Sequence, residues 1–200
     1  MNLYFFMTAA AILLFANPAE AQKEHVYWIY FKTEKPIGKL ITSETDSAKF
    51  RKYKLRSNLS FTFVKEFTVN FQLETLYKNG ILIDGSTVNV VSGKTKNTST
   101  VTKKADVYLL NLNGERKKLN DKVITYSTSK LYFYEPKNSK KVYSEKHGAY
   151  FPLEKVGEKS YKMTMAHGRH NIYSYNSEGL CDQIHIENGF KSFTMRLKKN

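Results

Sequence analysis

The chain has 200 residues, a formal net charge of +14 and a single cysteine. This length suits one domain with a sizeable core, and one cysteine excludes an intrachain disulfide framework. Of the 32 basic residues, 27 are lysine and 5 are arginine. Nucleic-acid-binding proteins favour arginine, which contacts phosphates and bases through paired hydrogen bonds, so we expect no nucleic-acid partner. An anionic surface or ligand is compatible with the charge.

Residues 1–21 have the pattern of a signal peptide. An apolar run of 13 residues, 3–15, precedes Ala19-Glu20-Ala21, whose small outer residues predict cleavage after Ala21. The run is too short to span a bilayer core of about 30 Å as a helix. We therefore expect an exported bacterial protein, periplasmic or extracellular, whose mature part is one domain over residues 22–200 without a transmembrane segment. No lysine or arginine precedes the apolar run, and a membrane-anchored N-terminus is the alternative.

The strongest strand pattern covers residues 59–77. Eight of the ten odd positions are apolar, while the even positions are mostly polar. This period of two is typical of a strand with one buried face. A straight strand of 19 residues would be about 60 Å long, far beyond the usual length. We therefore predict a sharp bend or a break at Lys65-Glu66, where the apolar row is interrupted.

Shorter strand-like runs lie on both sides of this segment, separated by turn signals. Asn79-Gly80, Asn113-Gly114 and Asn188-Gly189 are dipeptides that two-residue hairpin turns require. Residues 92–104 are the most polar stretch, and we interpret them as a flexible hairpin end. Strands joined by short turns are antiparallel neighbours, so the pattern predicts one antiparallel meander of about ten strands. The further runs are residues 26–32, 37–45, 81–91, 98–102, 107–112, 141–144, 161–165, 171–175, 180–186 and 190–197.

The sheet needs a cover for its apolar face, and no segment of ten or more residues has helical periodicity. The sheet must therefore curl into a barrel or half-barrel, fold into a sandwich, or leave an apolar groove. Residues 131–134 are apolar four times in succession, and Pro136 follows. We predict that they form a short helical turn, capped by Ser127, Thr128 or Ser129, that lies as a plug in the hollow. The expected fold is all-β, a half-barrel wrapped on this plug.

The aromatic residues suggest a candidate ligand groove. One strand face carries Phe61, Phe63, Phe67 and Phe71, which are core residues by default. If the half-barrel is open, part of this row lines an apolar groove together with the plug residues Leu131, Tyr132, Phe133 and Tyr134. The rim of this groove would then be formed by tyrosines whose hydroxyls contact water and whose rings are buried: Tyr132, Tyr134, Tyr143 and Tyr150.

Two groups of polar residues are candidates for a chemical site. His167, Arg169 and His170 form either a weak anion contact or an ordinary hairpin tip. A zinc site usually needs a third protein ligand, which no motif spacing supplies, so we expect no metal. Glu135 and Glu145 flank a lysine-rich turn, and surface charge pairing explains them more simply than a pair of catalytic carboxylates.

Cys181 is the remaining candidate nucleophile, and His185 is the nearest base in sequence. Residues four apart in a strand lie about 13 Å apart, so the two cannot form a hydrogen-bonded pair. We interpret Cys181 as a small strand residue. Because phosphate-loop and hydrolase motifs are also absent from the sequence, we predict no catalytic residue, no cofactor and no enzymatic activity.

Several short motifs, taken in order, resemble those of a known family. They are Val26–Tyr30, Pro36-Ile37-Gly38, the Phe-rich strand, Tyr77–Leu82, Leu131–Pro136, Val142–Glu145 and a Tyr-rich C-terminal meander. The chain resembles bacterial exported proteins of unknown function whose curved antiparallel sheet is related to the half-barrels of periplasmic lipoprotein carriers and VioE. The resemblance implies a half-barrel wrapped on a short helix and an exported location, with no established activity.

Three hypotheses on function follow. The first is binding of a lipid, an acylated ligand or an envelope partner in the concave face, by analogy with related half-barrels. The second is a structural or protein-interaction module whose hollow is filled by residues 131–134. The third is a hydrolase whose site has no recognisable motif. An unfilled apolar cavity beside the Phe row would favour the first hypothesis over the second.

Overall fold

A computed structural model describes residues 21–32, 34–62, 66–188 and 191–199. These residues form one antiparallel sheet and two short 3-10 turns, η1 (Lys130–Tyr132) and η2 (Ala166–Gly168). The strands are β1 (Ala21–Tyr30), β2 (Pro36–Ser47), β3 (Phe50–Thr62), β4 (Glu66–Lys78), β5 (Ile81–Val91), β6 (Lys94–Lys104), β7 (Val107–Leu112), β8 (Glu115–Leu119), β9 (Lys141–Ser144), β10 (Ala149–Gly157), β11 (Ser160–Thr164), β12 (His170–Tyr175), β13 (Cys181–Asn188) and β14 (Lys191–Leu197).

The predicted all-β meander is confirmed, although the described residues form fourteen strands rather than about ten. Two of the additional strands, β8 and β10, are largely exposed. β8 is ERKKL, with four exposed residues in succession, and β10 is exposed over its last four residues. Such strands are held mainly by their ladder hydrogen bonds and bury few side chains, so hydrophobic alternation does not reveal them.

The predicted interruption of residues 59–77 is confirmed as a complete break. β3 ends at Thr62 and β4 begins at Glu66, and the two strands pair antiparallel with Phe61 opposite Phe67. Two long strands therefore replace one, and both present their apolar residues to the same side of the sheet. Phe63 and Lys65 lie outside the described residues.

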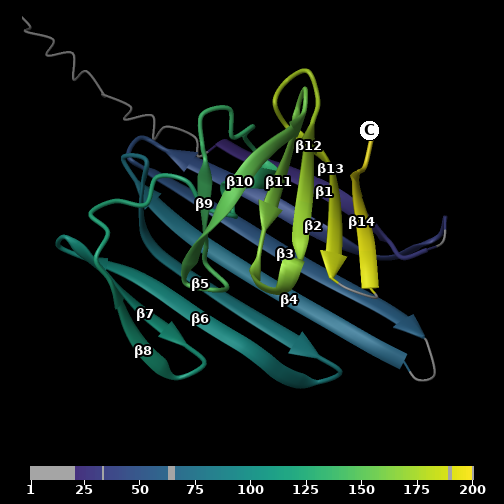
Figure 1. Ribbon diagram of the computed structural model, residues 1–200, viewed down its shortest axis with the longest axis horizontal. Coiled ribbons are helices and arrows are strands. Elements are labelled where there is room, and N and C mark those ends of the chain that lie inside the picture. Colours follow the sequence, from purple (N-terminus) through teal and green to yellow (C-terminus); the bar gives the residue numbers. More distant parts are fainter. Residues whose placement is uncertain (1–20, 33, 63–65, 189–190, 200) are drawn as a thin grey trace, which may run out of the picture.

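The order of strands in the sheet determines where the plug lies. The order is β8-β7-β6-β5-β4-β3-β2-β1-β14-β13-β12-β11-β10-β9, so β1 and β14 are neighbours in the middle and β8 and β9 form the two edges. Residues 120–140 connect these edges and must cross the sheet. Figure 1 shows β9–β14, in green and yellow, lying in front of the long strands β2–β4. Side chains of Leu40, Leu73, Val142 and Tyr173 belong to one core, so the sheet folds over on itself.

Tyrosine hydroxyl groups hold the backbone of the crossing segment. The hydroxyl of Tyr175 donates a hydrogen bond to the carbonyl of Leu131 at 2.8 Å, and Tyr27 donates to the carbonyl of Tyr132 at 3.2 Å. Tyr126 donates to the carbonyl of Tyr134. The last carbonyls of a short helical turn lack partners within the turn, so these hydroxyls satisfy groups that burial would otherwise leave unpaired.

The plug residues join two parts of the core. Leu131 is fully buried with residues of β1–β4 and β9–β14, while Phe133 packs with Tyr53, Tyr77 and Tyr108 in a second cluster. The predicted helical turn is present as η1, with Ser129 as its N-cap residue, but no side chain caps it. None of the helices in the part of the chain described here is both long and apolar enough to cross a membrane.

A buried carboxylate anchors the start of the plug. Glu145 is 1% exposed, and its carboxylate accepts hydrogen bonds from the hydroxyls of Ser127 and Thr128 and from the backbone N–H of Ser129 at 3.3 Å. The backbone carbonyl of Glu145 accepts a further bond from Ser99 at 2.7 Å. Glu145 is therefore a structural acceptor that joins the plug to β6 and β9, and the sequence-based interpretation of surface charge pairing is wrong for it.

We predict that Glu145→Ala lowers the free energy of unfolding by about 3 kcal/mol, because a buried donor left without an acceptor costs about 1–3 kcal/mol. Urea denaturation of wild type and variant measures the difference. Glu115→Ala is the matched control, since the Glu115 side chain is 68% exposed and such surface changes stay within about 0.5 kcal/mol. Equal losses in the two variants would contradict the anchoring role.

Candidate functional site

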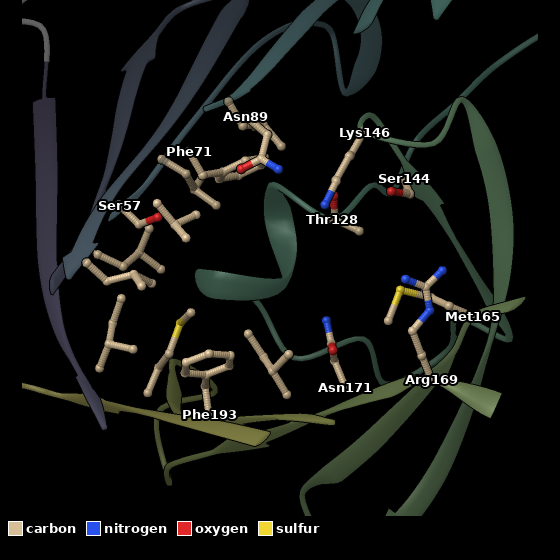
Figure 2. A pocket seen from close by; sticks show the side chains of 18 of the residues that line it. Ser57, Phe71, Asn89, Thr128, Ser144, Lys146, Met165, Arg169, Asn171 and Phe193 are labelled. Carbon is tan, nitrogen blue, oxygen red and sulfur yellow. The ribbon is translucent and has the colours of Figure 1, made fainter. Parts of the chain in front are cut away.

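A cavity of about 480 Å³ lies between the two folded-over parts of the sheet. β1–β5 contribute one wall and β11–β14 contribute the other, and the plug borders the space with Thr128 and Tyr132. Figure 2 shows the turn of η1 between Ser57 and Phe71 on one side and Ser144 and Met165 on the other. The apolar lining residues are Ile29, Leu40, Leu55, Leu59, Phe61, Phe67, Val69, Phe71, Leu73, Val91, Tyr132, Met163, Met165, Tyr173, Ile186, Phe193 and Met195.

The apolar wall is incompletely covered. Leu55 and Leu73 are buried, at 1% and 2% exposed, but Phe67, Val69 and Phe71 on the same sheet face are only half-buried. All five side chains line the cavity. Since a filled core would bury the whole row, the exposed part of these side chains is a surface that a ligand can cover.

The plug fills part of the hollow and leaves the cavity beside it. Of the four plug residues predicted for the groove, only Tyr132 lines the cavity, where its ring makes edge contacts with Tyr27 and Tyr173. Leu131 and Phe133 point into the two core clusters, and so do not line the space. Their prediction as groove residues does not fit the cavity, because the turn directs alternate side chains to different sides.

The predicted Phe row does line the space, through Phe61, Phe67 and Phe71. Phe63 lies outside the described residues. Tyr143, expected at the rim, is fully buried, because β9 is buried on both of its faces. The sequence of β11 also indicates a buried face on the opposite side of the cavity. Tyr161 and Met163 alternate with more exposed residues, and both are buried on that face.

Positive charge is concentrated on the side of the cavity opposite the Phe row. Lys146 and His147 follow β9, and Arg169 follows η2; all three line the cavity and are half-buried. Burial, followed by the Arg169 guanidinium, lowers the pKa of Lys146 below its usual range. Burial and the charges of Lys146 and Arg169 lower the pKa of His147.

These cations have no carboxylate partner among the described residues. The Arg169 Nε donates to the carbonyl of Ala166 at 3.3 Å, and neither Arg169 nor Lys146 forms an ion pair there. Glu187 lines the cavity, but its carboxylate lies 3.1 Å from His170 Nε2. Lys146 and Arg169 therefore present positive charge to the cavity without a direct ion pair among the described residues, and Glu187 is the one carboxylate among the residues that line this space.

An amide adds to the polar side of the cavity. Asn171 follows Arg169 by two residues, and Figure 2 shows its side chain pointing into the cavity. The Asn171 Nδ2 donates to the Tyr173 hydroxyl at 3.3 Å, while its buried Oδ1 has no hydrogen-bond partner in the described structure. The other polar lining residues are Ser57, Asn89, Thr128 and Ser144.

The group His167, Arg169 and His170 does not converge on one point. Only Arg169 lines the cavity. His167 is exposed and has a positive φ of 60° in η2, whereas His170 pairs with Glu187. Sequence reasoning therefore found one of the cations, and it missed Lys146, which lies in an ordinary polar turn with no distinguishing motif.

The candidate catalytic side chains have structural surroundings. Cys181 is fully buried, and burial raises the pKa of its thiol well above the usual range, so the nucleophilic thiolate is disfavoured. Glu135 accepts a hydrogen bond from the Tyr161 hydroxyl at 2.8 Å. In the part of the chain that the structure describes, no group of three or more His, Cys, Asp or Glu side chains is placed to hold a metal ion.

Comparisons with other proteins agree with this architecture. Residues 27–198 match the family described as a domain of unknown function, DUF6134. No curated protein matches the sequence. The chain is similar to the crystal structure of a beta-barrel-like protein of the domain of unknown function DUF1849 from Brucella abortus, with 12% sequence identity, a TM-score of 0.56, and coverage of 90% of this chain and 96% of the Brucella chain. The expected curved-sheet fold of an uncharacterised domain is thereby confirmed.

Tyr134 and Lys130 belong to a polar cluster outside the cavity lining. The hydroxyl of Tyr134 donates to Glu44, a buried carboxylate that also lies 3.2 Å from Arg51 Nε. Lys130 Nζ donates to the carbonyl of Thr125 at 2.6 Å. Burial and then the charge of Arg51 lower the pKa of Lys130 to about 8, although nearby carboxylates favour the charged form.

We predict that wild type gains stability relative to Lys130→Met as the pH rises from about 8 to 10.5, the unshifted pKa of lysine. Below this window Lys130 is charged in both states, and the cost of its burial is present in full. Within the window the unfolded chain binds the proton and the folded protein does not, so stability increases with pH.

Urea denaturation of wild type and Lys130→Met across this pH range gives the difference in unfolding free energy. Lys118→Met, at an exposed lysine of β8, controls for the loss of one positive charge. A wild-type-to-Lys130→Met difference that stays constant with pH would contradict the prediction.

Proposed function

The chain belongs to the DUF6134 family, and we propose that this protein binds the apolar chain of a lipid or acylated ligand in the cavity beside β3 and β4. One observation carries the proposal: about 480 Å³ of apolar-lined space is left unfilled after the plug has packed. Small-molecule sites in proteins have volumes of about 300–1,000 Å³ and are mostly apolar.

The shape of the wall supports a ligand with an aliphatic chain. Side chains of Phe67, Val69 and Phe71 are half-buried in the free protein, and a chain laid along them would remove this surface from water. Each methylene buried contributes about 0.8 kcal/mol. Met163, Met165 and Met195 complete the opposite wall, and methionine adapts its shape to ligands of different length.

The alternative, a structural module whose hollow is filled by residues 131–134, explains fewer of these observations. It accounts for the burial of Leu131 and Phe133, which pack as a core requires. It gives no reason for a half-buried row of aromatic residues beside an unfilled space. For this reason ligand binding takes precedence over a purely structural role.

The proposal is tested by filling the cavity from one strand. Val91 lines the cavity and lies opposite Val69 in the neighbouring strand. We expect Val91→Phe to reduce binding of Nile red, an uncharged apolar dye, at least tenfold, because the larger side chain occupies the space. Native mass spectrometry of the protein purified from bacterial envelopes should likewise show less copurifying lipid.

Val88→Phe is the matched control for this variant. It makes the same change in the same strand, at a valine that is 38% exposed and does not line the cavity. Binding by Val88→Phe should equal that of wild type. Full dye binding by Val91→Phe, or wild-type protein that binds neither dye nor lipid, would refute the proposed function.

We further propose that the protein acts in the bacterial cell envelope after export. The support is the sequence of residues 1–21, of which only Ala21 lies in the described part of the structure, at the start of β1. A carrier or binder of acyl chains is useful where lipids and lipoproteins are exposed to water.

Export is tested by the mass of the mature chain. Expression of the full sequence in a bacterium should give a processed protein in the periplasmic or extracellular fraction that begins at Gln22. Replacing Ala19 and Ala21 with bulky residues should block processing, because the peptidase requires small side chains there. An intact N-terminus at Met1 in the cytoplasmic fraction would show that the chain is not exported by this route.

A further inference from the structure

We infer that the ligand is a single-chain amphiphile with an anionic headgroup, and that Lys146 and Arg169 bind this headgroup. The inference rests on the proposed function, since it assigns a chemical class to the occupant of the same cavity. A fatty acid is the simplest molecule with these properties.

The first argument is uncompensated charge. Both cations line an otherwise largely apolar space, both are half-buried, and neither pairs with a carboxylate among the described residues. Other half-buried basic groups do have partners: Arg51 contacts Glu44 and Asp46, Lys162 contacts Glu154, and Lys130 donates to a backbone carbonyl, whereas the Lys146 ammonium has neither kind of partner among the described residues. Two neighbouring like charges near an apolar surface repel each other, and an anion placed between them would relieve this repulsion.

The second argument is the separation of the two cations from the aromatic residues of the cavity. Figure 2 shows Lys146 and Arg169 on one side of the cavity, and Phe71 and Phe193 on the opposite side. A ligand that satisfies both walls needs a charged end and an aliphatic end. Neutral apolar molecules would leave the two cations without a partner, and small anions would leave the aromatic row uncovered.

The third argument is an amide with spare hydrogen-bonding capacity next to the cations. Asn171 has an Oδ1 without a partner. A half-turn of its amide would let the Tyr173 hydroxyl donate to this oxygen and would leave the amide N–H groups free to donate to another acceptor. Asn171 thus supplies a third donor for a carboxylate held by Lys146 and Arg169.

The test compares ligands that share one chain and differ in the headgroup. Displacement of Nile red by laurate, lauryl alcohol and lauryltrimethylammonium gives three dissociation constants for the full mature protein. Laurate should bind wild type at least tenfold more tightly than the alcohol, and the cation should bind most weakly. In Lys146→Gln/Arg169→Gln, laurate should lose this preference, while binding of lauryl alcohol stays within about twofold of wild type.

The control is Lys118→Gln/Arg116→Gln, which removes the same two residue types from the exposed strand β8. Its preference for laurate should equal that of wild type. In Lys146→Arg/Arg169→Lys both charges are kept, so a preference for laurate should persist. These variants separate charge recognition from a general loss of structure.

Each outcome decides between the two claims. Equal binding of laurate and lauryl alcohol by wild type, or an unchanged preference in Lys146→Gln/Arg169→Gln, would overturn the headgroup assignment and leave the proposed function standing. If none of the three ligands displaces the dye and wild type does not bind the dye itself, the proposed function fails and the inference fails with it. Should the double variant not fold, the order of the three wild-type constants alone decides.

Discussion

Covering one long apolar sheet face with almost no helix is the constraint on which the rest of this structure depends. The sheet meets it by folding over, so that β9–β14 pack on β1–β4. Because its edges β8 and β9 are consecutive in the chain, residues 120–140 must cross the concave side. Tyrosine hydroxyls and the buried carboxylate of Glu145 satisfy the backbone of that segment. The cavity is the part of the hollow that one crossing segment leaves unfilled.

Local pattern was sufficient where apolar residues alternate with polar ones over a long stretch. The alternation in residues 59–77 correctly indicated a bend or a break at Lys65-Glu66, because a lysine at an odd position would fall on the buried face. Residues 92–104 were interpreted as a flexible hairpin end, yet most of them form β6. Their stability comes from distant partners: Ser99 bonds the hydroxyl of Thr87 and the carbonyl of Glu145. Such tertiary hydrogen bonds leave no signal in the segment itself.

The apolar and the charged side of the candidate site also differed in how far the sequence predicted them. The apolar side could be predicted from the sequence, because Phe61, Phe67 and Phe71 all lie at odd positions of the alternating segment. The charged side could be predicted only in part, since Arg169 was a candidate and Lys146 was not. Lys146 and Arg169 lie in separate polar turns of β9–β14, and only the folding over of this part places them in one cavity with the Phe row. A long-range arrangement of this kind follows from topology, and a single sequence does not encode it as a motif.

The pairing of β1 with β14 has a consequence for how the molecule can assemble. The first and last strands meet in the middle of the sheet, so hydrogen bonds at this seam form only after the whole chain has emerged. Contacts between distant ends of a chain are slow to form, because a long loop must close first. Loss of β14 would therefore break the hydrogen-bonded sheet at its centre instead of trimming an edge, and β1 and β13 would each become an edge strand.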